Sequence, residues 1–416
     1  MSALDSQENA RWRAKARDLA ETVVRPLAQK YDQLQEYPWE IKEAVAEAGL
    51  MKVWIPSEYG GEAGETPFLD LCIVVEELSR ADPAIGVLYS VNALGSLPIL
   101  LAGTEEQKQR YMPKIATGEK LIAFCLSEKT AGSDAQALKV RALPTVEGTW
   151  RIHGEKKWTT NGGPADLYTV FAVTDPEEKR RRISAFIVEK EMPGFSIGKV
   201  EDKMGIRAVP VVETRFDGVE VGAEQLLGGE PGLGFKHAMM TLDRARPSVA
   251  AQGMGTAQGA LDLACVYANR RQQFGKPVGA FQMVQKLLAD MSAKTEAARQ
   301  LVYSAARMLD TGLPNTTKMA AQAKLFATDI AMEVCTDAVQ VFGGYGFMRD
   351  YPIEKYMRDA KITQIYEGTN QVQRLVIARA LLADAEQELT HLERFIPVEE
   401  QEIYEESAES EPVPAG

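Results

Sequence analysis

The side chains best able to do chemistry stand in residues 365–371, which read Ile-Tyr-Glu-Gly-Thr-Asn-Gln. One carboxylate, Glu367, directly precedes a glycine, a hydroxyl and two amides. A glycine lets a ligand approach the backbone closely. A ligand held there would lie beside the Glu367 carboxylate, which could then remove a proton from one of its carbon atoms. The alternative from the local sequence is a solvated turn in which Thr369 caps a helix that runs through Arg379.

Five further stretches combine polar side chains with glycine or aromatic residues. The first, 124–134 (FCLSEKTAGSD), is a probable strand running into a loop. The second, 157–163 (KWTTNGG), could present an indole face and a hydroxyl to a planar heterocycle. The third, 243–247 (DRARP), is expected at the head of a helix, where an arginine can bind a phosphate or a carboxylate. The fourth is 271–276 (RQQFGK), which is followed by Phe281 and Gln282. The fifth is 340–347 (QVFGGYGF). Its paired glycines would admit a diphosphate, and Arg271 could supply the countercharge.

Each of these stretches also has an ordinary structural interpretation. Residues 124–134 could be a plain turn, and residues 157–163 could hold a tryptophan buried at a β-turn. The arginine of residues 243–247 could form a surface salt bridge, and Gly343 and Gly344 could be a helix C-cap. Neither GxxxxGK[ST] nor a GxGxxG after a strand occurs, so the chain shows no P-loop or dinucleotide fingerprint.

Composition and charge exclude several classes of function. The chain has 416 residues, 45% of them hydrophobic, which predicts a globular protein of two or three domains. Seven glutamates between 399 and 411 supply most of the net charge of −12, so no nucleic-acid surface is expected. The four cysteines and three histidines are scattered, which excludes a disulfide framework, a metal site and a Ser-His-Asp triad, and fits a reducing cytoplasm. The N-terminus carries no signal peptide pattern.

The elements that must position these side chains follow an α, β, α order. Residues 1–120 are helical, with Thr104 and Gln107 forming a capping box. Residues 84–103 are uncharged over a membrane-spanning length, but their glycines and prolines favour a buried helix pair around a turn over membrane insertion. Residues 121–234 form short strands of a compact antiparallel barrel or sandwich, because no long helices separate them. Residues 235–385 form a bundle of long antiparallel helices, and 386–416 form an acidic, mobile tail. The fold class is α+β. The strands are expected at 121–126, 150–153, 167–174, 183–189 and 211–216.

Read together, FCLSEKTAGSD, KWTTNGG, LDRARP, RRQQFGKP, QVFGGYGF and QIYEGTNQVQR closely resemble the acyl-CoA dehydrogenase family of flavoenzymes, in order and spacing, from about residue 10 to 382. This resemblance implies a helical N-terminal domain, a β-barrel middle domain and a C-terminal four-helix bundle. It also implies a homotetramer, a dimer of dimers, with FAD bound across a subunit interface. The implied reaction converts an acyl-CoA thioester to the trans-2-enoyl-CoA and passes electrons to an electron-transferring flavoprotein.

The resemblance assigns roles by position. Glu367 would be the base that removes the α-proton, while the β-hydride passes to flavin N5, and its backbone N–H would donate a hydrogen bond to the thioester oxygen. The residues expected to line the flavin are Phe124, Leu126, Ser127, Trp158, Thr160, Thr369 and Gln371. Those expected to hold the adenosine diphosphate half, reaching in from the neighbouring subunit, are Arg271, Phe274, Gln282, Gln340, Gly343 and Gly344. Those expected to contact the CoA thioester are Ser133, Asp243, Arg246, Gly368 and Arg379.

Three positions depart from patterns within the family. Lys129 follows Glu128, where many relatives have a proline. Ala245 stands where some branches of the family carry their base. Gly86 stands where glutaryl-type members carry an arginine. The last departure makes a dicarboxylate substrate less expected. Short, branched, alicyclic and aromatic-substituted acyl groups all stay open. Part of the acyl pocket is expected to be lined by Val87, Leu88, Tyr89, Val91 and Leu94.

Two other functions compete with the dehydrogenase. An oxidase of the same fold would pass electrons to oxygen and release peroxide. A non-catalytic acyl-CoA binding or assembly subunit would have no need of a base, which Glu367 argues against.

Overall fold

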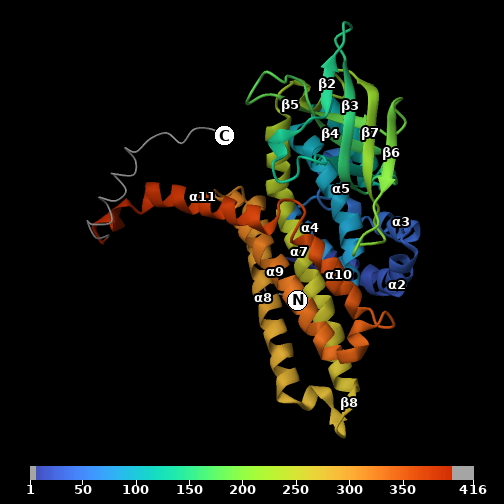
Figure 1. Ribbon diagram of the computed structural model, residues 1–416, viewed down its shortest axis with the longest axis vertical. Coiled ribbons are helices and arrows are strands. Elements are labelled where there is room, and N and C mark those ends of the chain that lie inside the picture. Colours follow the sequence, from blue (N-terminus) through green and yellow to red (C-terminus); the bar gives the residue numbers. More distant parts are fainter. Residues whose placement is uncertain (1–5, 396–416) are drawn as a thin grey trace.

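The computed structural model describes residues 6–395 and confirms the α+β class, with helices, a sheet and further helices in chain order (Figure 1). The N-terminal helices are α1 (Gln7–Leu19), α2 (Arg25–Leu34), α3 (Trp39–Glu47), α4 (Pro67–Ala81), α5 (Pro83–Ala102) and α6 (Glu105–Ala116), with a π-helical turn, Ala20–Val24, between α1 and α2. The capping box of Thr104 and Gln107 at α6 is confirmed. A second capping box, of Ser6 and Asn9, begins α1.

Helix α5 corrects the expectation of a helix pair, because it runs unbroken through Pro98. Its glycines serve close packing rather than a turn. A Cβ at Gly86 would lie 1.9 Å from the Ser79 hydroxyl of α4, and one at Gly95 would lie 3.1 Å from the Ile122 side chain. Among the described residues, α5 is the one helix long and apolar enough to cross a membrane, and most of it is buried in the protein.

The middle part is one sheet of seven strands. These are β1 (Ile122–Cys125), β2 (Arg141–Pro144), β3 (Trp150–Thr160), β4 (Leu167–Val173), β5 (Ile183–Glu189), β6 (Phe195–Val200) and β7 (Val211–Val221). The order is β1-β4-β2-β3-β7-β6, with β5 also paired to β4. The sheet is mainly antiparallel, as expected, but β1 and β4 pair in parallel, with Phe124 opposite Thr169. Sequence missed β2 and β6 and the full lengths of β3 and β7, since these stretches carry many exposed polar residues.

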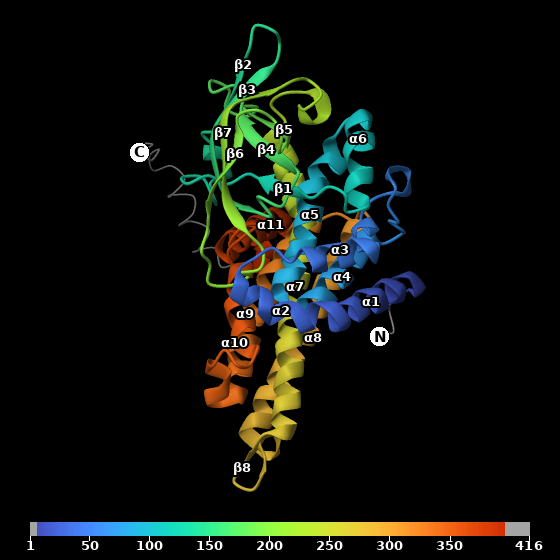
Figure 2. The same ribbon diagram turned by 90° about the vertical axis from the view of Figure 1, so that its right-hand side faces the viewer.

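The C-terminal part consists of long packed helices. They are α7 (Gly234–Arg270), α8 (Gln282–Asp310) and α9 (Thr316–Phe342), followed by α10 (Ile353–Thr363) and α11 (Asn370–Glu388). Helix α7 packs against α4, α5, α8 and α9, so it joins the N-terminal and C-terminal helices into one body. A small hairpin, β8 (Gln272–Gln273) and β9 (Lys276–Pro277), joins α7 to α8 at the end of the molecule opposite the sheet (Figures 1 and 2).

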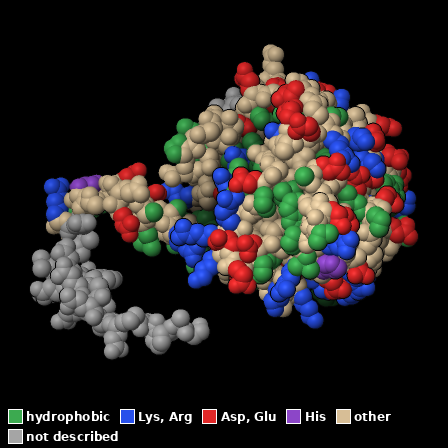
Figure 3. Space-filling view, turned by 90° about the horizontal axis from the view of Figure 1, so that it is seen from above, with side chains coloured by type: hydrophobic (Ala, Val, Ile, Leu, Met, Phe, Trp, Pro, Cys, Tyr) green, Lys and Arg blue, Asp and Glu red, His purple; other side chains and the backbone are tan. Residues whose placement is uncertain are grey.

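Two findings adjust local expectations. Residues 243–247 lie well inside α7, with Pro247 part of the helix, so they are not at a helix head. Helix α11 extends away from the body as an arm (Figures 1 and 3), and its Leu375, Leu381 and Leu382 side chains are exposed. The predicted acidic tail lies, from residue 396, outside the described residues.

Candidate active site

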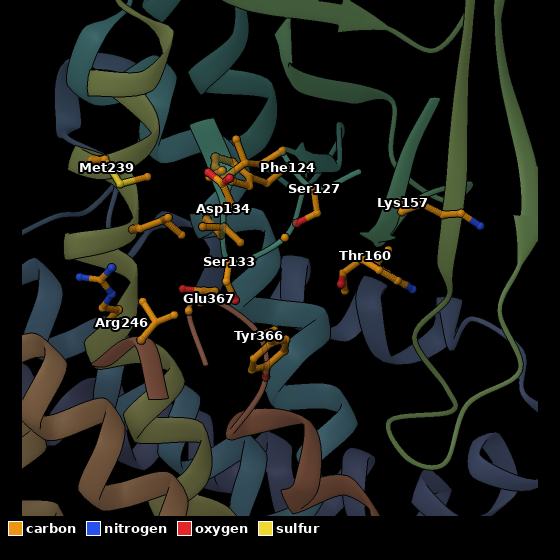
Figure 4. Close-up of a pocket in the computed structure, with 18 of the residues that line it drawn as sticks. Phe124, Ser127, Ser133, Asp134, Lys157, Thr160, Met239, Arg246, Tyr366 and Glu367 are labelled. Atoms are coloured by element: carbon orange, nitrogen blue, oxygen red, sulfur yellow. The ribbon is translucent and has the colours of Figure 1, made fainter. Parts of the chain in front are cut away.

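A cavity of about 550 Å³ lies between the sheet and the helices, and Glu367 points into it (Figure 4). Its walls come from α5, the loop after β1, the end of β3, α7, the turn before α11 and α11 itself. Segments far apart in sequence therefore meet at one place. The structure brings ten of the predicted site residues together here: Phe124, Leu126, Ser127, Ser133, Trp158, Thr160, Arg246, Glu367, Gly368 and Arg379.

The turn that carries Glu367 has an uncommon backbone. Glu367 has φ of +54° and Gly368 has φ of +90°, both in the left-handed region. A glutamate rarely adopts this conformation, and such residues persist where the surroundings hold them. Here the side chain of Gln373 donates to the carbonyl oxygens of Gly368 at 2.9 Å and of Glu367 at 3.4 Å. Thr369 caps α11 by accepting from the Val372 amide, which is the part of the alternative interpretation that the structure confirms.

The environment of the Glu367 carboxylate favours its protonated form. Its Oε2 atom is buried and has no hydrogen-bond partner within residues 6–395. Burial raises the pKa of Glu367 from 4.5 to about 7, against the opposing charges of Lys324 and Arg246. A carboxylate with a pKa near neutrality is suited to general base catalysis, since it is partly ionised and more basic than a solvated one. Glu367 is thus a carboxylate that lines a cavity and could act as a base there, not one in a solvated turn.

The sheet side of the cavity presents an aromatic face and hydroxyl groups. A register shift in β3 between Lys156 and Thr159 accompanies a φ of +56° at Trp158, whose side chain is 54% exposed. The bulge turns this indole out of the sheet, because an extra residue changes the side to which side chains point. Thr160 and Ser127 lie on the same side of the cavity (Figure 4). Lys157, the first residue of the KWTTNGG stretch, also lines it, and its ammonium is paired with Glu213 and Glu201.

The side chain of Glu128 holds the loop after β1 in place. The loop therefore does not depend on a proline at the next position, where this chain has Lys129. Glu128 is buried and accepts hydrogen bonds from the amides of Lys139 at 2.7 Å and Val140 at 3.0 Å. It also pairs with the buried ammonium of Lys156 at 2.8 Å. Lys129 is exposed at the tip of the turn. The side chain of Glu128, rather than a proline after it, fixes this wall of the cavity.

Arg246 reaches the cavity from α7, on the side of Glu367 opposite Thr160 (Figure 4). It is 5% exposed, its Nε atom has no partner among the described residues, and its Nη1 atom donates to Asp243 at 2.5 Å. Asp243 itself does not line the cavity; its other oxygen accepts from Thr317. Its contact with CoA stays a prediction. Ala245 is buried in α7 and likewise does not line the cavity, so no second carboxylate competes from that position.

Two helix faces make the apolar wall. On α5 the lining residues are Val87, Ser90, Val91 and Leu94, and on α7 they are Phe235, Met239, Leu242 and Arg246. Leu88 and Tyr89 are corrections to the expected pocket, since both are buried away from it and the Tyr89 hydroxyl donates to the Leu50 carbonyl. Both sets are spaced by three and four residues, the period of one helix face. That spacing was the signal for the α7 residues that sequence reasoning missed.

The remaining predicted cofactor residues lie elsewhere on the protomer. Arg271, Gly343 and Gly344 line an open groove of about 530 Å³ near the end opposite the sheet. Phe274, Gln282 and Gln340 are exposed residues of the same region. Thr369 and Gln371 line a third hollow, of about 370 Å³, with Asp329 and Arg374. In the described part of the chain, no single cavity is lined by all the predicted cofactor residues, which are divided among the Glu367 cavity, this groove and this hollow.

The donor groups fit the cofactor that the resemblance implies. Trp158, Ser127 and Thr160 offer an aromatic face and hydroxyls to a planar ring system. Space is open around both Gly343 and Gly344, where a built Cβ would meet nothing within 4 Å. The Arg271 guanidinium lies over the Tyr345 ring at 5.1 Å, beside these glycines. An open glycine pair next to an arginine suits a diphosphate.

Comparison with known proteins shows the family. Three family models match consecutive parts of the chain: Acyl-CoA dehydrogenase, N-terminal domain (6–119), middle domain (123–219) and C-terminal domain (232–382). The chain therefore belongs to the acyl-CoA dehydrogenase family. It is an acyl-CoA dehydrogenase, an FAD-dependent oxidoreductase acting on CH–CH bonds.

Individual relatives show which members of the family the chain is similar to. The chain is 46% identical to the short-chain specific acyl-CoA dehydrogenase of Clostridium acetobutylicum, over 88% of this chain and 96% of that protein. It is 42% identical to the solved butyryl-CoA dehydrogenase of Megasphaera elsdenii, with a TM-score of 0.88 over 92% of this chain and all of that one. An acyl-CoA dehydrogenase of Bacillus anthracis, solved in complex with FAD, is 32% identical with a TM-score of 0.86, over 93% of this chain and 70% of that one.

Proposed function

We propose that this enzyme removes the α-proton and β-hydride from a short-chain acyl-CoA, with Glu367 as the base and the trans-2-enoyl-CoA as the product. The observation that carries the proposal is the Glu367 carboxylate. It points into the cavity, one of its oxygens is buried without a partner among the described residues, and burial raises its pKa to about 7. A binding or assembly subunit would have no use for a base so placed.

The α-carbon of a thioester is too weakly acidic for an unaided carboxylate, so charge developing on the thioester oxygen must be stabilised. In the described part of the chain, the backbone amide of Glu367 donates to no acceptor, so it is free to bind that oxygen. A substrate held there would place its α-carbon beside the carboxylate of the same residue. Arg246 lines the cavity and keeps positive charge near the reacting end. The Lys157 ammonium is instead paired with Glu213 and Glu201.

FAD, when bound, supplies the acceptor for the β-hydride. We assign its flavin ring to the wall of Phe124, Leu126, Ser127, Trp158 and Thr160. Ser133, Gly368 and Arg379 lie in the same cavity and are assigned to CoA, as is Asp243 behind Arg246. The apolar faces of α5 and α7 exclude water from the acyl chain and from Glu367.

A homotetramer explains why the cofactor residues lie apart in one protomer. We assign Arg271, Phe274, Gln282, Gln340, Gly343 and Gly344 to the adenosine diphosphate half of an FAD whose flavin lies in a neighbouring subunit. Thr369 and Gln371 would contact that same shared FAD. The exposed leucines of α11 offer an apolar surface for such a contact. Dilution of the enzyme should therefore release FAD as the oligomer dissociates, which sedimentation and flavin fluorescence would detect together.

The acyl chain and the electron acceptor complete the proposal. The relatives named for short-chain and butyryl-CoA substrates favour a short acyl chain. We assign the electrons to an electron-transferring flavoprotein and the enzyme to the cytoplasm, where its four unpaired cysteines would stay reduced.

Anaerobic flavin bleaching against a panel of acyl-CoA thioesters tests the reaction and ranks its substrates. The panel should run from butyryl-CoA to octanoyl-CoA and include branched, alicyclic, aromatic and dicarboxylic members. Bleaching by none of them would overturn the proposal. Rapid reoxidation by air with release of peroxide would favour the oxidase.

A further inference from the structure

A buried lysine lies beneath the turn that carries Glu367. Lys324 of α9 has no exposed surface, and its Nζ atom donates to the carbonyl oxygen of Gly368 at 2.9 Å and to Oδ1 of Asn370 at 2.8 Å. The Asn370 amide nitrogen donates to Thr328 at 2.9 Å and to Asp329 at 2.7 Å. Through these bonds α9 fixes both the residue after Glu367 and the first residue of α11.

The charge of this lysine is unusual for its place. A buried ammonium is costly unless negative charge compensates it, yet both of its hydrogen-bond acceptors are neutral oxygens. Burial lowers the pKa of Lys324 to about 7, while the charge of Glu367 raises it. Conversely, Lys324 is the main charge that lowers the pKa of Glu367 against burial. The two groups therefore favour each other's charged form.

We propose that Lys324 is a positioning residue for Glu367, holding the Gly368 carbonyl and supplying the positive charge that helps the base ionise in its cavity. This inference rests on the proposed function of Glu367. No motif in the sequence pointed to Lys324, which lies forty-three residues earlier on another helix.

Other charged groups also face the pair and must be kept constant in a test. Arg246 of α7 lowers the pKa of both Glu367 and Lys324, and Asp329 of α9 raises that of Lys324. The Tyr366 hydroxyl, in the same turn, is engaged with Gln252, and burial raises its pKa well above its usual range. These three groups are left unchanged in every variant below.

Gln373 allows the anchoring role to be separated from the charge. It donates to the same Gly368 carbonyl as Lys324 but carries no charge. Lys324→Met removes a donor and a charge, whereas Gln373→Met removes a donor alone. Both changes should slow flavin reduction, since both loosen the turn. Lys324→Met alone should also raise the pH at which Glu367 ionises, by about one unit.

The test is an infrared titration of the Glu367 carboxyl in the FAD-loaded full chain without substrate, with the Glu367→Gln protein subtracted. We expect a higher midpoint for Lys324→Met than for the wild type, and an unchanged midpoint for Gln373→Met and for Lys324→Arg. If Lys324→Met does not fold, Lys324→Gln is compared with Lys324→Arg in the same way. An equal midpoint in the folded, uncharged variant would overturn the charge role of Lys324.

The titration needs no turnover, so the two proposals can fail separately. A wild-type enzyme whose flavin no acyl-CoA bleaches would overturn the proposed function and leave the titration result standing. A wild type that bleaches normally, with equal titration midpoints in all folded variants, would overturn the role of Lys324 alone.

Discussion

The side-chain amide of Gln373 lies 2.9 Å from the carbonyl oxygen of Gly368 and donates to it, which ties the first turn of α11 to the residue after Glu367. A Cβ atom at Gly368 would lie 2.6 Å from that same amide nitrogen. Glycine at this position therefore serves both the left-handed backbone and the hydrogen bond. A methyl group at this position would push the Gln373 amide away from the Gly368 carbonyl, next to Glu367.

Gly368→Ala should damage both stability and catalysis. Alanine in a left-handed conformation costs about 1–2 kcal/mol of the free energy of unfolding, and the displaced turn should slow flavin reduction by roughly a hundredfold. Denaturant unfolding and anaerobic stopped-flow absorbance measure the two effects. Gly222→Ala, at a glycine whose φ is not positive and whose nearest atom is 3.4 Å away, is the control. Equal rates in the two variants would contradict the role of the turn.

Glu367→Gln should keep FAD but lose flavin reduction. The amide has nearly the same shape and cannot take the α-proton, so the rate should fall roughly a thousandfold, as for loss of a general base. Flavin absorbance of the purified protein reports retained FAD, and bleaching by the best acyl-CoA reports the chemistry. Glu58→Gln, at an exposed glutamate, controls for charge. Near-normal bleaching by the Glu367 variant would remove Glu367 as the base.

The rate of flavin reduction should rise with pH through about 7. Burial raises the pKa of Glu367 from 4.5 to about 7, and only the ionised carboxylate can accept a proton. The base is thus mostly protonated and inactive at pH 5, and mostly ionised and active at pH 8. Stopped-flow reduction at limiting substrate, which reports the free enzyme, gives the midpoint. A midpoint near 4.5 would show that Glu367 is solvated in solution.

Arg271→Gln should weaken FAD binding and leave the Glu367 cavity intact. Loss of one charge-assisted hydrogen bond to a diphosphate should raise the dissociation constant for FAD about tenfold or more. Isothermal titration of the flavin-free protein with FAD measures it. Arg270→Gln changes the adjacent exposed arginine, which lies outside the groove, and is the matched control. If both variants bind FAD equally, the assignment of the groove is wrong.

Met239→Ala should shift the substrate preference toward longer acyl chains. Met239 lines the cavity on α7, and truncating it lengthens the space available to the acyl group. One methylene in an apolar pocket is worth roughly ten-fold or more in specificity, so the efficiency with octanoyl-CoA relative to butyryl-CoA should rise about tenfold. Met240→Ala, one residue further and outside the lining, should leave the ratio unchanged. An unchanged ratio for Met239→Ala would place the acyl chain elsewhere.

Local sequence was a good guide wherever the deciding interactions are local. The capping box of Thr104 and the cap at Thr369 were read correctly, because both depend on residues three positions apart. The unbroken α5 was not, because the packing of Gly86 against Ser79 is not visible along the chain. The parallel pairing of β1 with β4 was missed for the same reason, since strand order is a property of the whole sheet.

By itself, the sequence determined the order of the domains and the family, and it predicted Glu367 as the base, because ordered motifs of particular residue types carry that information. Tertiary structure alone decided the chemistry around the base. It buried the Oε2 atom of Glu367, placed Lys324 and Arg246 beside that carboxylate, and set Leu88 and Tyr89 outside the pocket that Met239 enters. The physical reason is that desolvation and charge proximity depend on distances in space between residues on different helices, which no spacing along the chain specifies.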